Sequence, residues 1–209
     1  RLGVNASEVR IVVLGVLPIN DPPDFDLVPR FEVHEDSRTT LAQAAFNVST
    51  GNPFEWDQNV SFRVAPASPE GGIVAATPTM LANGTLNLTV EPDRYGDIAF
   101  DVTLFDDGGL LRGGNDTSTT KRFVLGVLPV NDPPLFDLAQ RVSVWEDSGR
   151  TTHLATARNI STGNAWEADQ LLTFSLLQYW GDASVFAAQP RIAPNGTLTF
   201  EVAPDRCGE

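Results

Sequence analysis

Apolar and polar residues alternate with a period of two along much of the chain. Val60, Phe62 and Val64 are separated by more polar residues, and the same alternation runs through 84–91 and 97–105. Because successive side chains of a β-strand point to opposite faces, this pattern predicts strands that are buried on one face. No segment shows a sustained helical period.

Turn sequences such as Asn83-Gly84 and Asp106-Asp107-Gly108-Gly109 separate these segments. We therefore predict seven strands, near residues 28–34, 44–48, 58–65, 72–77, 84–91, 97–105 and 118–128. Seven short strands in about 110 residues predict an all-β fold, an immunoglobulin-like β-sandwich. We expect the aromatic side chains in the core and at the domain ends, rather than on a ligand platform; the tryptophans are Trp56, Trp145, Trp166 and Trp180.

A segment of eleven residues occurs twice, 111 residues apart. Residues 13–23 and 124–134 differ only at Ile19 and Val130, and both run from an apolar stretch into Asn-Asp-Pro-Pro. Consecutive prolines donate no N–H and force the preceding residue into an extended conformation, so a sheet ladder ends there. Other parts of the two copies match at a spacing of 111 or 112, among them 35–37 with 146–148, 49–52 with 161–164, 83–86 with 195–198 and 92–94 with 204–206.

The spacing predicts tandem β-sandwich repeats. Residues 1–20 are expected to be the last strand of a preceding repeat, residues 21–131 one complete repeat, and residues 132–209 the first part of the next. One such repeat is long enough to bury its own core. Because Arg1 stands within the repeat pattern, we expect the sequence to belong to a longer polypeptide.

The net charge of −13 and the pI of about 4.4 disfavour binding to nucleic acid or anionic lipid and suit cation binding or solubility. The sequence contains no apolar stretch long enough for a transmembrane span. Cys207 is the single cysteine, so the sequence predicts no disulfide framework. Two alternatives stay open for Cys207: a partner elsewhere or a free thiol.

Eight of the twelve asparagines begin an Asn-x-Ser/Thr sequon, whereas we expect roughly two by chance from this composition. The excess predicts an extracellular or cell-surface glycoprotein that carries N-glycans. The alternative is that some of these strings are only turns that enter strands, as at Asn83 and Asn195. The sequons begin at Asn5, Asn47, Asn59, Asn83, Asn87, Asn115, Asn159 and Asn195.

We find no catalytic constellation in the sequence and predict that the chain is not an enzyme. His34 and His153 do not align across the repeats, which disfavours a shared catalytic or metal-binding role. Neither a phosphate-binding glycine loop nor a Gly-x-Ser-x-Gly motif occurs. The carboxylates recur in register with the repeat, which indicates a repeated structural element rather than a catalytic pair.

The order of the acidic motifs resembles a known family. Glu35-Asp36 comes first, then Glu-x-Asp, then Asp93-Arg94, and finally Asn131-Asp132-Pro133-Pro134-Leu135-Phe136. This order resembles cadherin-like and related tandem immunoglobulin-like repeats of large extracellular proteins, over nearly the whole chain. The hinge is similar to the Asn-Asp-x-x-Pro-x-Phe hinge of cadherins.

The resemblance implies calcium between consecutive repeats, and calcium takes six to eight oxygen ligands. For the hinge at 131–132 it implies the ligands Glu35, Asp93, Asn131, Asp132, Glu167 and Asp169. For the hinge at 20–21 it implies Asn20, Asp21, Glu55, Asp57 and Asp106.

The chain departs from the family pattern at three places. Tyr95 stands where cadherins have a second acid, Glu167 replaces an aspartate, and the double proline shortens the linker. The same acids also suit the capping of turns, a role that Asp and Asn commonly have. Calcium binding and a purely structural role in turns therefore both stay open.

Two functions follow from these expectations. The first is a structural segment of a long extracellular glycoprotein, such as a stalk, filament or surface-appendage subunit, in which each repeat contacts mainly its neighbours. The alternative is a calcium-dependent cell-adhesion module. The expected partners are neighbouring repeats of the same polypeptide, together with self-assembly or another surface protein. A carbohydrate-binding module is disfavoured because the tryptophans fall in different registers of the two copies.

Overall fold

The computed structural model describes residues 3, 5, 7–69, 71–177 and 181–208. The chain forms two compact units. Unit 1 comprises residues 1–33, 37–90 and 97–126, and unit 2 comprises residues 34–36, 91–96 and 127–209. In the described part of the chain the helical segments are three short 3-10 turns, η1 (Leu111–Gly113), η2 (Ala165–Glu167) and η3 (Ala183–Val185). The all-β prediction is therefore confirmed, and no described helix is long and apolar enough to cross a membrane.

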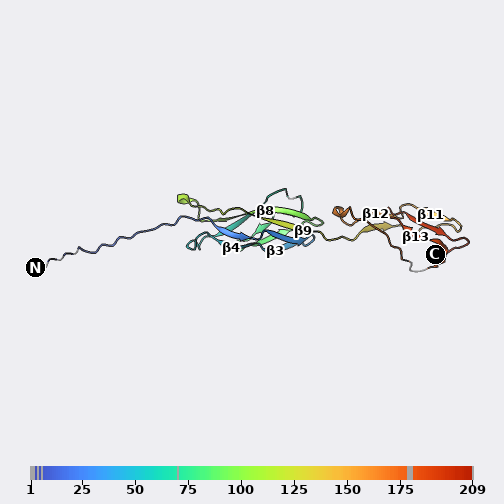
Figure 1. The fold of residues 1–209 in the computed structure, drawn as a ribbon, viewed down its shortest axis with the longest axis horizontal. Helices are drawn as coiled ribbons and strands as arrows, with labels where there is room; N and C mark the ends of the chain where they lie inside the picture. Colours follow the sequence, from blue (N-terminus) through green and yellow to red (C-terminus); the bar gives the residue numbers. More distant parts are fainter. Residues whose placement is uncertain (1–2, 4, 6, 70, 178–180, 209) are drawn as a thin grey trace. The chain divides into compact units, whose positions relative to one another are not determined.

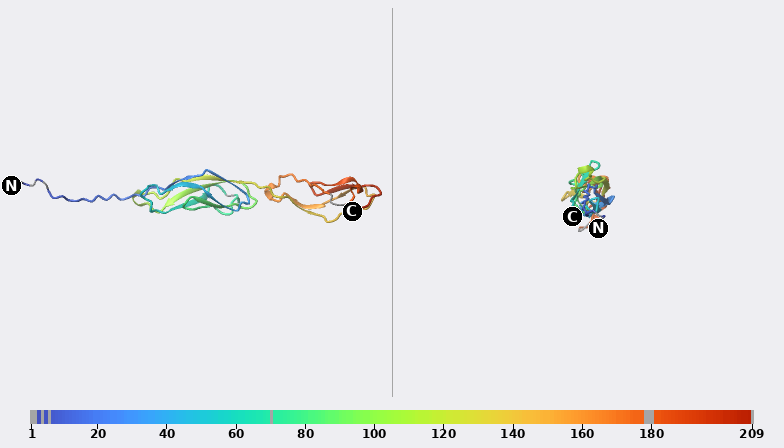
Figure 2. Two further views of the ribbon diagram at one scale, coloured as in Figure 1. Left: turned by 90° about the horizontal axis from the view of Figure 1, so that it is seen from below. Right: turned by 90° about the vertical axis from the view of Figure 1, so that its left-hand side faces the viewer.

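Unit 1 is built from three sheets, and its strands run alongside one another in Figure 1 and in the left-hand view of Figure 2. A four-stranded sheet has the order β2-β9-β8-β5, a three-stranded sheet the order β3-β7-β6, and β1 pairs with β4. The strands are β1 (Asp24–Leu27), β2 (Arg30–His34), β3 (Thr39–Gln43), β4 (Ala45–Ser49), β5 (Val60–Pro66), β6 (Thr79–Met80), β7 (Thr85–Thr89), β8 (Gly96–Asp106) and β9 (Lys121–Leu128).

The alternating side chains of β7, β8 and β9 form the core of unit 1. Along β8 every second residue from Ile98 to Leu104 is buried, as the period of two predicts. Phe100 stacks on Phe123 of β9 with their ring centroids 5.3 Å apart, and the edge of Phe31 packs against Phe123 at 5.5 Å. Aromatic pairs of this kind contribute about 0.5–1.5 kcal/mol beyond the burial of their area.

Unit 2 contains β10 (Leu135–Leu138), β11 (Arg150–His153), β12 (Ala157–Ser161), β13 (Phe186–Ile192) and β14 (Leu198–Val202). β10 pairs with β12, and β14 lies between β11 and β13. The buried residues Leu198, Phe200 and Val202 of β14 form its core cluster. They lie 112 residues after Leu86, Leu88 and Val90, so the two units bury the same alternating positions.

The same irregularity occurs where β1 pairs with β4 and where β10 pairs with β12. The register shifts next to Asn47 and Asn159, which adopt φ values of 48° and 52°. Asn tolerates this left-handed conformation better than most residues. Each amide donates to an aspartate on the facing strand: Asn47 Nδ2 to Asp26 Oδ2 at 2.7 Å, and Asn159 Nδ2 to Asp137 Oδ2 at 2.5 Å. These two sequon asparagines therefore also hold a β-bulge.

Some of the predicted elements are wrong. No strand forms over 72–77, where Val74 makes only an isolated bridge with Val90, and the strand of this region is β6. β1 and β3 were not predicted, because neither alternates clearly and both are defined by their partners β4 and β7. The expectation of packed tryptophans is wrong for Trp56 and Trp145, which are 83% and 88% exposed. Trp166 is half exposed and packs under the Arg94 guanidinium, and Trp180 lies outside the described residues.

Residues 7–19 contain no strand, and their large apolar side chains are exposed. The assignment of residues 1–20 to a preceding repeat therefore stays a prediction, as do the boundaries at 21–131 and 132–209.

A glycine holds a loop against the linker in each unit. Gly51 has φ +97°, and a Cβ there would lie 2.4 Å from the carbonyl oxygen of Pro22. Gly163 has φ +96°, and its Cβ would lie 2.5 Å from the carbonyl oxygen of Pro133. Both positions require glycine because an added methyl group meets backbone that has little room to move.

We expect Gly51→Ala to lower the free energy of unfolding by about 2 kcal/mol or more, since it adds a steric clash to backbone strain. Gly113→Ala is the matched control, because Gly113 has φ +87° but open space around it. The control should lose about 1 kcal/mol. Urea denaturation measures both, and equal losses would contradict a role for the close approach.

Candidate metal centre

The linker residues Asn131 and Asp132 are held by side chains of the loop at 164–170, all within unit 2. The Asp132 amide donates to Glu167 Oε2 at 3.2 Å, and Asn164 Nδ2 donates to Asp132 Oδ2 at 3.1 Å. Gln170 Nε2 donates to Asn131 Oδ1 at 3.0 Å. Three side chains of one loop therefore fix the position and direction of the linker.

The loop can make these contacts because Asn164 forms the turn that presents it. Its Oδ1 accepts from the Trp166 amide at 2.9 Å and so caps η2, which leaves Nδ2 available for Asp132. Glu167, the last residue of η2, is buried and faces the linker. The loop thus places a carboxylate and two amide groups against the linker.

A three-carboxylate cluster lies beside this linker, also within unit 2. Asp36, Asp93 and Asp132 each offer one carboxylate oxygen, and the three oxygens lie within 4.8 Å of one another. Asp36 and Asp93 adopt φ values of 63° and 56°, and the Asp93 amide donates to Asp36 Oδ1 at 3.3 Å. Calcium binds oxygen at 2.3–2.6 Å, so two ligands on opposite sides of one ion are about 5 Å apart. The spacing of the three oxygens fits one such ion.

Glu35 brings a fourth carboxylate to the same region, and it is only 1% exposed. Its Oε1 accepts from the Val130 amide at 2.7 Å, whereas its buried Oε2 has no hydrogen-bond partner. Burial raises the pKa of Glu35, and the nearby Asp36, Asp132 and Glu167 raise it further, against the opposing effect of the Val130 hydrogen bond. A buried carboxylate oxygen without a donor is destabilising, and a bound cation would satisfy it.

The linker Asn20–Asp21 is held in the same way within unit 1. The Asp21 amide donates to Glu55 Oε1 at 3.2 Å, Asn52 Nδ2 to Asp21 Oδ2 at 3.0 Å, and Gln58 Nε2 to Asn20 Oδ1 at 2.7 Å. These are the counterparts of Glu167, Asn164 and Gln170. We call this repeated set of contacts the linker clamp.

Asp106 extends the clamp of unit 1. Its Oδ1 accepts from Asn20 Nδ2 at 2.9 Å, and the same Nδ2 donates to the Asn115 carbonyl oxygen at 2.8 Å. Buried oxygens without a partner occur here too: Glu55 Oε2, Gln58 Oε1 and Asp106 Oδ2. Together with Glu35 Oε2, they are the buried side-chain atoms that lack a partner in the described part of the chain, and all four lie at the two linkers.

The structure brings most of the sequence-predicted ligands to the linkers. Asp93 and Asp132 join one cluster, Glu35, Asn131 and Glu167 contact the same linker, and Asn20, Asp21, Glu55 and Asp106 form the other network. Asp57 and Asp169 are exposed and take part in neither set of hydrogen bonds. Asp169 instead lines a cavity of about 320 Å³ together with Tyr95, Asn131 and Glu167. Whether any of these residues binds calcium stays a prediction.

Sequence reasoning missed Asp36 and the amide residues of the clamp. Asp36 follows Glu35, and Asp147 follows Glu146 at the matching position of the second copy. This recurrence of the second acid was the signal in the sequence that could have identified Asp36. The clamp amides belong to a pattern Gly-Asn-x-x-Glu-x-Asp-Gln that begins at Gly51 and again at Gly163. Tyr95, which replaces an acid of the cadherin pattern, donates through its hydroxyl to the Trp166 carbonyl oxygen at 3.1 Å.

All eight sequon asparagines are exposed. Asn83, Asn115 and Asn195 accept through Oδ1 from the amide two residues later, at 3.0–3.1 Å, so they also form turns. Exposure keeps every sequon eligible for modification, and glycosylation stays a prediction.

No protein-family profile matches the chain, and no curated protein matches it. Among solved structures, the chain is similar to Drosophila N-cadherin EC1-4 with 14% sequence identity and a TM-score of 0.35. The match covers 90% of this chain and 42% of that structure. At this level of similarity the match carries no argument about function.

We expect Glu35→Gln to raise the stability of the metal-free protein by roughly 1 kcal/mol at pH 7, because the substitution removes a buried charge. A raised carboxyl pKa means that Glu35 lowers stability above its unfolded-state pKa and ceases to do so below it. The difference between the variant and the wild type should therefore vanish near pH 4. Thermal unfolding in EDTA at both pH values measures it, and a loss of stability at pH 7 would contradict the account.

Proposed function

We propose that this chain is a structural segment of a long extracellular glycoprotein made of tandem β-sandwiches with calcium-stiffened joints. The observation that carries the proposal is the linker clamp, which recurs at Asn20–Asp21 and at Asn131–Asp132 with the same residue types. A catalytic site is not expected to recur at the same position of each repeat. The contacts that hold a linker, in contrast, are needed at every linker.

Calcium suits these sites for a chemical reason. The donors are hard oxygens from carboxylates and amides, with no sulfur or imidazole nitrogen among them. The three aspartates beside Glu35 repel one another, and a divalent cation would turn that repulsion into attraction. Bound at this position, the ion would tie the turns at 34–36 and 91–96 to the linker and oppose its bending.

The glycoprotein part of the proposal is supported by the density of sequons and by their uniform exposure. Hydrophilic glycans along both units would keep the surface of a long extracellular chain from associating nonspecifically. The acidic surface has the same effect.

We expect isothermal titration to show calcium binding that Asp132→Asn weakens roughly tenfold, because the variant removes one charged ligand. Asp101→Asn is the control: it also removes one carboxylate, but from the middle of β8, where Asp101 pairs with Arg122. The control should titrate like the wild type. A flat trace up to millimolar calcium would overturn the metal site.

We expect small-angle scattering to show a narrower distribution of lengths in calcium than in EDTA, since a tied linker bends less. Asp132→Asn should reduce this difference and Asp101→Asn should not. Calcium binding without any change in scattering would contradict a mechanical role for the ion.

We expect the protein to carry N-glycans when it is secreted from a eukaryotic host, seen as a loss of intact mass after enzymatic deglycosylation. Thr197→Ala is the informative variant, because it destroys one sequon while the Thr197 amide still bonds Asn195. Its mass should fall by one glycan with unchanged folding. An unchanged mass after deglycosylation of the wild type would refute the glycoprotein assignment.

A further inference from the structure

Asn87 is a sequon asparagine in the middle of a sheet rather than in a turn. It lies at the centre of β7, which has β3 on one side and β6 on the other. Leu86 and Leu88 are buried, whereas Asn87 between them is exposed, so its side chain stands on the outer face of the sheet. A glycan attached there would rise from the sheet itself and lie over the neighbouring strands.

The side-chain amide of Asn87 has no hydrogen-bond partner in the described part of the chain. In contrast, the side-chain nitrogens of Asn47, Asn59 and Asn159 each donate to an aspartate, at 2.5–2.8 Å. The attachment of a sugar to Asn87 therefore displaces no contact of the fold.

Leu41 of β3 lies directly across from Asn87, and it is 67% exposed. Directly paired residues of antiparallel strands point to the same face, with their Cβ atoms about 4.5–5.5 Å apart. On the other side of Asn87 the paired residue is Thr79 of β6. Leu41 therefore offers apolar surface within reach of the first sugar on Asn87.

The first sugar of an N-glycan is N-acetylglucosamine, which suits such a contact. Its ring has faces made of C–H groups, and its acetyl group ends in a methyl. The sugar can cover a leucine with these groups while its hydroxyl groups stay in water. Removal of the leucine side chain from water in this way is favourable.

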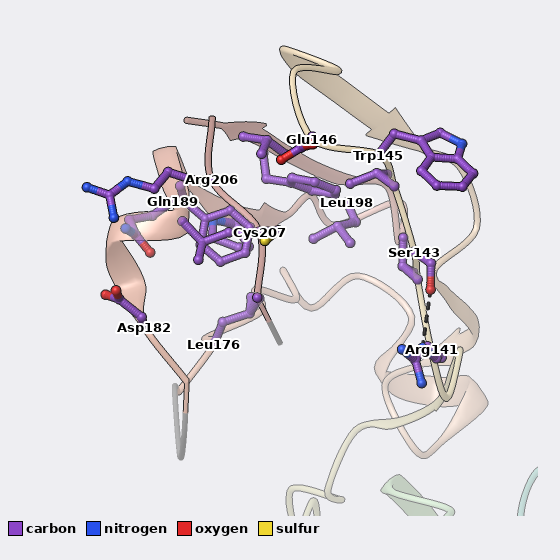
Figure 3. Close-up of a pocket in the computed structure, with 18 of the residues that line it drawn as sticks. Arg141, Ser143, Trp145, Glu146, Leu176, Asp182, Gln189, Leu198, Arg206 and Cys207 are labelled. Atoms are coloured by element: carbon purple, nitrogen blue, oxygen red, sulfur yellow. Dashed lines mark hydrogen bonds between the residues drawn. The ribbon is translucent and has the colours of Figure 1, made fainter. Parts of the chain in front are cut away.

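Unit 2 lacks this sequon and also lacks the leucine. The counterpart of Asn87 is Thr199 of β14, and the residue paired with it on β11 is Thr152. Leu198 lines the pocket of unit 2 that Figure 3 shows, so Thr199, the next residue, points to the opposite face of the strand. Asparagine thus faces leucine in unit 1, and threonine faces threonine in unit 2. The leucine accompanies the sequon and is not a general feature of the repeat.

The strand that carries Leu41 is also an unprotected edge. β3 lies at the edge of its sheet, and its sequence Thr-Thr-Leu-Ala-Gln contains neither a charged residue nor a proline. Proteins usually protect such an edge from pairing with another chain by charge, proline or a covering segment. The corresponding strand β11 begins with Arg150. A bulky hydrophilic group on the strand next to β3 would supply the missing protection.

We infer that Asn87 carries an N-glycan whose first sugar packs on Leu41 and covers it on the outer face of the β3-β7-β6 sheet. The inference rests on the glycoprotein part of the proposed function and is independent of calcium. The sugar shields Leu41 from water and from other chains, and Leu41 in turn holds the sugar against the sheet. This glycan is then part of the folded structure rather than a loose attachment.

Peptide mass spectrometry of the full chain, secreted from a eukaryotic host, tests whether Asn87 is occupied. Enzymatic deglycosylation converts each occupied asparagine to aspartate, and we expect this conversion at Asn87. An unmodified Asn87 beside occupied sequons elsewhere would overturn the inference and leave the glycoprotein proposal in place. A chain without any glycan would refute both.

A double-mutant cycle tests the contact by thermal unfolding of the glycosylated protein. We expect Asn87→Gln to lower the melting temperature by roughly 2–4 °C, because Leu41 then returns to water. The variant Leu41→Thr introduces the residue type of Thr152, which suits an exposed strand. In that background Asn87→Gln should lower the melting temperature by less than half as much, because the sugar has lost its apolar partner. Equal losses in both backgrounds would overturn the contact while the glycoprotein proposal stands.

Ser61→Ala is the matched control for the loss of one glycan. It destroys the sequon of Asn59 but keeps the Asn59 side chain, which donates to Asp107. Its effect on the melting temperature should be the same with and without Leu41→Thr. If Leu41 were coupled to this second sequon as strongly as to Asn87, the effect would be a general one of glycans and the inference would be overturned.

Trimming high-mannose glycans to their first sugar with an endoglycosidase separates the contact from the bulk of the glycan. The trimmed wild type should stay more stable than trimmed Asn87→Gln by a similar margin, because the first sugar makes the contact. Loss of this margin on trimming would contradict a role for Leu41.

Discussion

A buried carboxylate with only one of its two oxygens bonded is the constraint on which the linkers depend. Glu35 and Glu55 each accept one backbone N–H from a linker, and each keeps a second buried oxygen without a donor. The bonded oxygen positions the linker, whereas the unbonded one raises the free energy of the folded state. A bound cation at each linker would satisfy the unbonded oxygen.

The repeat explains why the arrangement occurs twice. Gly51 and Gly163 allow the loop to approach the linker, and Asn52 and Asn164 then use both ends of their amide groups, one for the turn and one for the linker. Each contact is weak in isolation. Because several of them share one loop, the position of the linker is determined by the loop as a whole.

The sequence by itself determined the all-β class, the repeat, and most of the strand and linker residues, because alternation and proline act locally. It did not locate β6, β1 or β3, since short strands are defined by the partner with which they pair. It also missed Asp36, which reaches Asp93 and Asp132 only because left-handed turns at Asp36 and Asp93 bring distant segments together. Only the tertiary structure decided that Glu35 and Glu55 are buried with an oxygen left unbonded, because burial depends on every segment that packs around a side chain.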